Sequence, residues 1–178
     1  MKSKIERHLS EIVFGAMDGT VTTFAVVAAA VGAGLSSTAV IILGIANLVG
    51  DGFSMGAGAY LSAKSGRDLR RRDKRVVRGH SPLLTGVVTY AAFIVVGSTA
   101  ILIYVVDALL NLHLGRYVLF GLSAALIAAT FILVGVTKAH VTKTSKFKAA
   151  AEALGLGSVA SIMTFLLGDI LADVLKSI

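Results

Sequence analysis

Cysteine is absent from this 178-residue chain, and charged residues and proline are scarce. Without cysteine, the chain can form neither a disulfide framework nor a thiolate metal site. Charged residues make up only 15% of the sequence, against about 25% in a typical soluble domain, and hydrophobic residues make up 56%. Proline occurs once, at Pro82, whereas glycine occurs nineteen times, which membrane helices tolerate and use for close packing. The composition therefore excludes an ordinary soluble domain and indicates an integral membrane protein.

Five apolar segments, each about 20 residues or longer, are long enough to cross a hydrocarbon core of about 30 Å. They cover residues 12–33, 38–63, 81–106, 117–137 and 153–175. The polar N-terminal stretch "MKSKIERHLSE" is not a cleaved signal peptide. We therefore expect an all-α integral membrane protein in which residues 1–178 form a single five-helix transmembrane domain.

The basic residues predict the orientation of these spans. Fifteen of the seventeen lysines and arginines lie before the first span, in the connection 64–80, or after the fourth span. Only Arg116 and Lys176 fall on the other side. The positive-inside rule then places the N-terminus and the basic loop 64–80 in the cytoplasm and the C-terminus outside. This topology accounts for the net charge of +7, so we expect contact with anionic lipid headgroups and no nucleic-acid partner.

Polar side chains interrupt the first two spans. Asn47, Asp51 and Met55 follow one another at steps of four, which places them on one helical face, and Asp18 lies in the preceding span. A carboxylate within the bilayer is costly, so it faces a bundle interior or a watery path, and a functional role is the first hypothesis. The short turn "GAGLSS" makes the two spans antiparallel neighbours, so that their polar stripes can line one path.

The chemistry of these side chains indicates a metal. Carboxylate and amide oxygens suit hard or borderline divalent cations, and a thioether adds softness, so that Asp18, Asn47, Asp51 and Met55 fit Fe²⁺ or Mn²⁺ in transit. The alternatives are that Met55 only packs and that Asn47 only forms an interhelical hydrogen bond. Glu11 and Glu152, at cytoplasmic helix ends, either admit metal or serve a surface role.

Glycines accompany both stripes. The sequences "GAMDG" and "GFSMG" have the small-xxx-small form that lets membrane helices approach closely. The expected packing residues are Gly15, Gly19, Gly52, Gly56 and Gly58.

The motifs "EIVFGAMDGTVTTFAVVAAAVGAGLSS" and "ILGIANLVGDGFSMGAGAYLSAKS" closely resemble those of the vacuolar iron transporter family. The resemblance implies five transmembrane helices per subunit and a homodimer with the ion path at its interface, lined by the first two helices. It also implies export of Fe²⁺, often also Mn²⁺, from the cytoplasm, with protons as counter-ions in antiport. Asp18 matches the family's path aspartate and Met55 its path methionine.

Two features of the chain differ from the plant members of that family. Asn47 stands where they carry a glutamate, and Asp51 is placed to compensate. Plant members also insert a cytoplasmic metal-binding domain after the second span, whereas this chain has a short basic connection there. The resemblance is thus to a short, prokaryotic-type member, which suggests a prokaryotic plasma membrane, or a vacuolar membrane if the source is eukaryotic.

Two other classes of function remain open. An intramembrane aspartyl protease would use the two aspartates as a dyad, but the nearest matches to its "GxGD" signature are "LVGD" and "LLGD", which lack the first glycine. A non-transporting scaffold would use the polar stripes only to hold a dimer together. No P-loop is present, and we expect a transporter that is not an enzyme and has no permanently bound cofactor.

Overall fold

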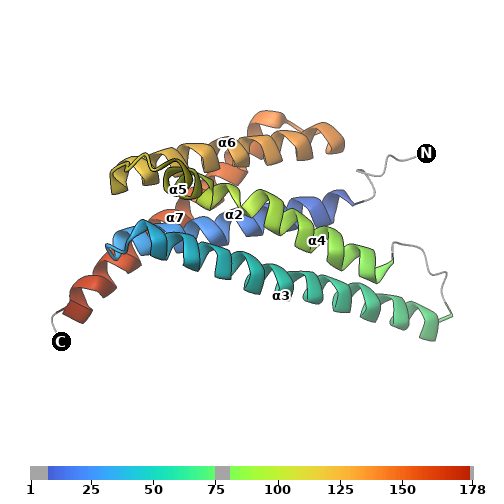
Figure 1. Ribbon diagram of the computed structural model, residues 1–178. Helices are drawn as coiled ribbons and strands as arrows, with labels where there is room; N and C mark the ends of the chain where they lie inside the picture. The colour runs from blue at the N-terminus through green and yellow to red at the C-terminus, as the bar shows by residue number, and fades with distance from the viewer. Residues whose placement is uncertain (1–7, 75–80, 177–178) are drawn as a thin grey trace.

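The computed structural model describes residues 8–74 and 81–176, which form six α-helices and no strand (Figure 1). The helices are α2 (Leu9–Gly32), α3 (Ser37–Arg72), α4 (Pro82–Gly97), α5 (Thr99–Leu110), α6 (Arg116–Thr142) and α7 (Lys146–Lys176). The prediction of an all-α fold is confirmed for these residues.

Four of the helices, α2, α3, α6 and α7, are each long and apolar enough to cross a membrane by themselves. The pair α4 and α5 meets the same criterion only when it is taken together, as one span bent by 48°. The described chain therefore holds four spans, or five if the bent pair counts as one.

The bend interrupts the segment 81–106, which we expected to be a single helix. At the break, Ser98 Oγ donates to the carbonyl of Val95 at 2.9 Å, and Thr99 Oγ1 donates to the carbonyl of Val96 at 2.6 Å. Hydroxyl groups that bond back to the preceding turn compete with the helical hydrogen-bond ladder and bend it. The sequence "GST" therefore ends α4, and α5 continues in a new direction to Leu110.

Helix α3 is longer than the expected span 38–63. It has 36 residues, about 54 Å at 1.5 Å per residue, and continues through the basic sequence to Arg72. The first nine residues of the expected loop 64–80 are therefore helical, because lysine and arginine are good helix formers and nothing in that stretch breaks the helix. Residues 75–80 lie outside the described part of the chain.

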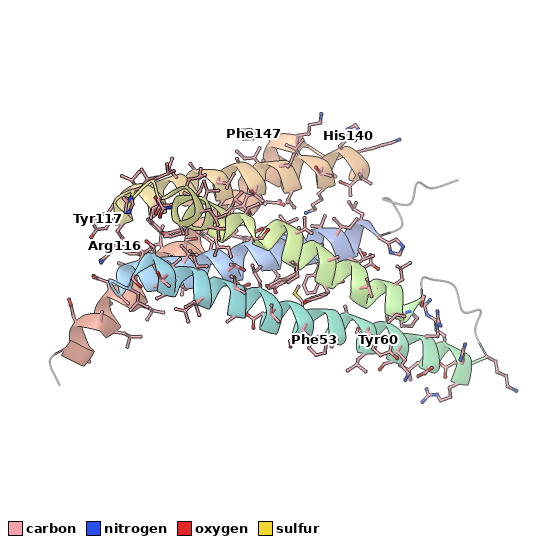
Figure 2. All side chains as sticks on the ribbon, in the orientation of Figure 1. Phe53, Tyr60, Arg116, Tyr117, His140 and Phe147 are labelled. Atoms are coloured by element: carbon pink, nitrogen blue, oxygen red, sulfur yellow. The ribbon has the colours of Figure 1, made fainter. Side chains whose placement is uncertain are left out.

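Helix α2 lies at the centre of the bundle and packs against α3, α4, α6 and α7 (Figure 1). The start of α2, the basic end of α3, the start of α4 and the turn between α6 and α7 gather at one end of the bundle. Arg116 lies at the opposite end, where its Nη2 donates to the carbonyl of Gly34 at 3.0 Å (Figure 2). Most of the described basic charge is thus collected at one end.

Much of the outer surface is apolar. Large side chains such as Phe53 (70% exposed), Val95 (68%) and Leu109 (74%) project outward from different helices. Phe53 is exposed on α3, whereas Tyr60, further along the same helix, is half-buried beside Gly86 of α4 (Figure 2). Such continuous apolar exposure is unfavourable in water and normal against lipid, so the chain is a multi-pass membrane protein.

Candidate functional site

The polar stripes of α2 and α3 meet where the two helices run side by side. Asn47 Nδ2 on α3 donates a hydrogen bond to Thr23 Oγ1 on α2 at 3.1 Å. Thr23 is buried and Asn47 is half-buried. The bond joins two helices through polar groups within the membrane, where each group would otherwise lack a partner. The alternative of an interhelical hydrogen bond for Asn47 is therefore realised in the single chain.

One turn closer to the basic end, each of these helices carries a carboxylate. Asp18 on α2 is half-buried and Asp51 on α3 is exposed, and the two helices that carry them pack against each other. In the described part of the chain, neither carboxylate accepts a hydrogen bond or forms an ion pair. The nearest lysine along α3, Lys64, lies more than three turns beyond Asp51. Two carboxyl groups on membrane-type helices thus lack a basic partner among the described residues, and either protons or a divalent cation can neutralise them.

Met55 occupies a different environment from Asp51. It is half-buried and packs against the apolar core that includes Leu48 and Phe93. A thioether in such a position fills space well, and its sulfur can still coordinate a soft metal ion. Packing, the alternative considered for Met55, is part of what this residue does.

The two glutamates considered as points of metal access lie on different sides of α2. Glu11 Oε1 accepts a hydrogen bond from Thr85 Oγ1 of α4 at 3.4 Å, and Glu11 Oε2 accepts one from Ser10 Oγ at 2.8 Å. Glu152 instead lines a cavity between α2, α6 and α7. The structure therefore does not bring them together.

Four of the five predicted packing glycines lie in close contacts. A Cβ atom on Gly15 would collide with the carbonyl oxygen of Thr89, and one on Gly19 would lie 2.5 Å from that of Phe93. Gly52 and Gly56 of α3 meet the side chain of Tyr90 in the same close manner. These contacts hold α4 against both polar helices and so set the spacing of the candidate site.

The fifth glycine, Gly58, has no neighbouring atom within 4 Å of the position of a Cβ. It is exposed and does not pack within this chain. The expectation that it packs is therefore not met by a contact inside the single subunit.

Thr23 is the residue of the site that the sequence analysis missed. A single hydroxyl on an apolar helix carries little signal, because threonine can satisfy itself by bonding to its own helix. Thr20 and Thr22 do this, donating to the carbonyls of Ala16 and Asp18. The available clue was that Thr23 lies five residues after Asp18, while Asn47 lies four before Asp51 in the antiparallel neighbour.

Within residues 8–74 and 81–176, no three histidine, aspartate or glutamate side chains come together as a metal-holding group. A single chain thus offers the Asp18–Asp51 pair, with Asn47 and Met55 nearby along α3, and no closed ligand shell. Such an incomplete set is suited to a passing ion and unsuited to a structural metal centre.

Comparison with known proteins agrees with the membrane architecture. Residues 9–80 and 73–169 match the profile of the family described as the VIT family. A "Vacuolar iron transporter" of Toxoplasma gondii is 44% identical over 68 residues, covering 38% of this chain and 22% of that protein. A "Vacuolar iron transporter" of Plasmodium falciparum is 43% identical over 68 residues, covering 38% of this chain and 25% of that protein.

A plant protein, "Vacuolar iron transporter 1" of Eucalyptus grandis, is 38% identical over 73 residues, covering 38% of this chain and 29% of that protein. The chain therefore spans less than a third of the length of these curated relatives.

Proposed function

Because the chain belongs to the VIT family, we propose that it moves a divalent metal ion, Fe²⁺ or Mn²⁺, out of the cytoplasm along α2 and α3. The observation that carries this proposal is a pair of carboxylates on neighbouring apolar helices, Asp18 of α2 and Asp51 of α3, which have no hydrogen-bond or ion-pair partner among the described residues. A cation that enters between them replaces mutual repulsion with two attractions.

The proposed ligands match the ions. Carboxylate and amide oxygens bind hard and borderline divalent cations, and the Met55 sulfur favours Fe²⁺ or Mn²⁺ over Mg²⁺ or Ca²⁺. Asn47 Nδ2 is engaged by Thr23, which leaves the amide oxygen of Asn47 available as an acceptor. The site holds no thiolate or imidazole that would bind the ion too tightly to release it.

We further propose that two copies of the chain form the path together. Small residues repeat at steps of four on the exposed face of α3 beside Asp51, with no neighbouring atom near the two glycines. They are Gly50, Ser54 and Gly58. Such a stripe allows a second helix to approach closely, and it borders Asp51. A homodimer along this face would bring two sets of ligands to one axis and complete the ligand shell that one chain lacks.

Orientation and coupling complete the proposal. By the positive-inside rule, the end of the bundle with most of the described basic charge faces the cytoplasm. In this topology α4 and α5 together form one bent span, so that the chain crosses the membrane five times. Carboxylates must be deprotonated to bind metal, so metal entering the path displaces protons. Proton antiport follows if those protons leave towards the cytoplasm and the carboxylates take up protons from the other side when the metal departs there.

The test is metal flux into proteoliposomes that contain the purified protein, with Fe²⁺ and Mn²⁺ supplied separately. We expect Asp18→Asn and Asp51→Asn to abolish flux, because an amide cannot supply the negative charge, and Met55→Ala to reduce it. Asp173→Asn is the matched control, because Asp173 is an exposed aspartate near the far end of α7. A folded protein that carries neither metal under any pH gradient would contradict the proposal.

The same vesicles test the coupling and the other two classes. Flux that is insensitive to an imposed pH gradient would remove proton antiport while leaving transport intact. Absence of flux together with a stable dimer would favour a scaffold. Cleavage of a helical membrane substrate, lost in Asp51→Asn, would favour a protease.

The dimer is tested by cross-linking, for which the lack of native cysteine is an advantage. We expect Gly58→Cys to form an oxidised disulfide dimer in membranes, because Gly58 lies on the stripe and has open space around it. Gly121→Cys is the control, since Gly121 of α6 has equally open space on a different helix. Equal cross-linking at both positions would indicate random collision and would overturn the proposed interface.

A further inference from the structure

Helix α7 crosses the bundle obliquely. Near its first residues it lies against α6, where a Cβ on Gly135 would sit 2.8 Å from the carbonyl oxygen of Ala149. Near its other end it lies against α2, where a Cβ on Gly168 would sit 2.3 Å from the carbonyl oxygen of Ala29. Because α7 leaves one neighbour as it approaches the other, a wedge opens on each side of it.

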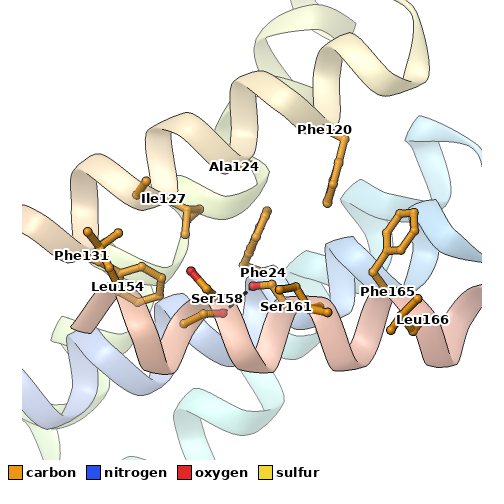
Figure 3. A pocket seen from close by; sticks show the side chains of 13 residues that line it. Phe24, Phe120, Ala124, Ile127, Phe131, Leu154, Ser158, Ser161, Phe165 and Leu166 are labelled. Carbon is orange, nitrogen blue, oxygen red and sulfur yellow. Dashed lines mark hydrogen bonds between the residues drawn. The ribbon is translucent and has the colours of Figure 1, made fainter. Parts of the chain in front are cut away.

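The two wedges have different chemistry. The outer wedge is lined by apolar and small uncharged side chains of α6 and α7 and by Phe24 of α2, and it has a volume of about 400 Å³ (Figure 3). Phe24 and Phe120 stack there with ring centroids 5.7 Å apart. The inner wedge lies between α2, α6 and α7 at the basic end of the bundle and has a volume of about 510 Å³.

The inner wedge combines an apolar floor with a polar mouth. Phe14 and Met17 of α2, together with Leu156 of α7, contribute to the floor. Lys138 and Glu152 contribute to the lining on the side nearest the helix ends. The cavity thus has the polarity of a phospholipid: apolar at membrane depth and charged where the headgroup lies.

We propose that the inner wedge binds one anionic phospholipid, with an acyl chain along Phe14, Met17 and Leu156 and the headgroup phosphate at Lys138. In the described part of the chain Lys138 forms no ion pair, so its ammonium group is available. This site goes beyond the proposed metal path and does not depend on which ion is carried.

Charge around the mouth favours an anionic headgroup over a zwitterionic one. The turn between α6 and α7 adds the exposed Lys143, and the first residue of α7 adds the exposed Lys146. Glu152 is the one acidic residue among the side chains that line the wedge. The first turn of α7 also begins here, and the positive end of its helix dipole favours an anion. Basic recesses between transmembrane helices on the cytoplasmic side are suited to anionic headgroups for these reasons.

Native mass spectrometry of the delipidated full-length protein, without metal, tests the site. Phosphatidylglycerol and phosphatidylcholine with identical acyl chains are titrated in turn. We expect tighter binding of the first phosphatidylglycerol, and Lys138→Gln should weaken it by about fivefold, the effect of one lysine near an anionic surface. Glu152→Gln should strengthen it, because a negative charge leaves the mouth.

Lys148→Gln is the matched control, because Lys148 is exposed in the same region but does not line the wedge. It should change the affinity for phosphatidylglycerol by less than about twofold, since a charge outside the wedge acts only through screened solvent. Glycerol 3-phosphate, which carries the charge without acyl chains, should not compete. Equal affinity for the two lipids, or an equal loss in Lys138→Gln and Lys148→Gln, would overturn the proposal. Because no metal is present, these outcomes are independent of the flux assay.

Discussion

The close contact between α2 and α4 at Gly19 predicts that alanine lowers the Tm at this position, whereas alanine at the open Gly121 keeps or raises it. A Cβ on Gly19 would lie 2.5 Å from the carbonyl oxygen of Phe93 and 2.9 Å from its Cα. Both atoms belong to the backbone, so no side chain can turn aside to make room. Gly19→Ala therefore has to push α4 away from α2.

The change in the free energy of unfolding for Gly19→Ala is the sum of two opposing contributions. Overpacking a tight interface costs about 1–3 kcal/mol, whereas alanine is a better helix former than glycine by about 0.5–1 kcal/mol. We expect a net loss of about 1–2 kcal/mol. For a chain of this size, that corresponds to a fall in Tm of roughly 2–8 °C.

Gly121→Ala is the matched control. Gly121 of α6 has no atom within 4 Å of the position of a Cβ, so only the helix-propensity term applies. Its Tm should stay constant or rise by up to about 4 °C. Since the chain has neither tryptophan nor cysteine, we would heat a fluorescent fusion in detergent and measure the folded fraction by size-exclusion chromatography. A Tm for Gly19→Ala that equals or exceeds that of Gly121→Ala would refute the close approach of α2 and α4.

Three further predictions follow from other contacts. In a double-mutant cycle, Asn47→Leu and Thr23→Val should show a coupling of about 0.6–1.7 kcal/mol in thermal stability, typical of hydrogen bonds between membrane helices; a coupling of zero would contradict the bond. Arg116→Gln should lower Tm by no more than about 4 °C, because its hydrogen bond to the α2–α3 turn is exposed; a larger fall in thermal melting would contradict this assignment. In intact cells, a membrane-impermeant maleimide should label Asn111→Cys directly and Ser145→Cys only after permeabilisation, and the reverse pattern would invert the proposed orientation.

The distribution of apolar and polar residues along the sequence was sufficient to predict the membrane class and the helical fold. Whether a helix can reside in lipid depends on the summed transfer free energy of its own side chains, which is a property of a local segment. The interruptions by Asp18 and Asp51 could be recognised for the same reason, since a charge at membrane depth is costly whatever its neighbours are. The close approach of Gly15 and Gly19 to another helix was likewise predictable, because glycine leaves the backbone uncovered.

Contacts between distant segments were not predictable in this way. The sequence did not reveal that Thr23 is the partner of Asn47, or that Glu11 and Glu152 lie on different sides of α2. It also did not reveal the 48° bend between α4 and α5, because serine and threonine bend a membrane helix only where the surrounding helices accommodate the bend.

Composition and hydropathy therefore determined which segments of this protein are apolar enough to cross a membrane and which polar groups are exceptional in them. The tertiary structure alone decided which of those groups meet, because the direction of a side chain depends on how the helices cross. The oblique path of α7 illustrates the difference: its sequence makes it a membrane helix, but its contacts at Gly135 and Gly168 open the two wedges beside it.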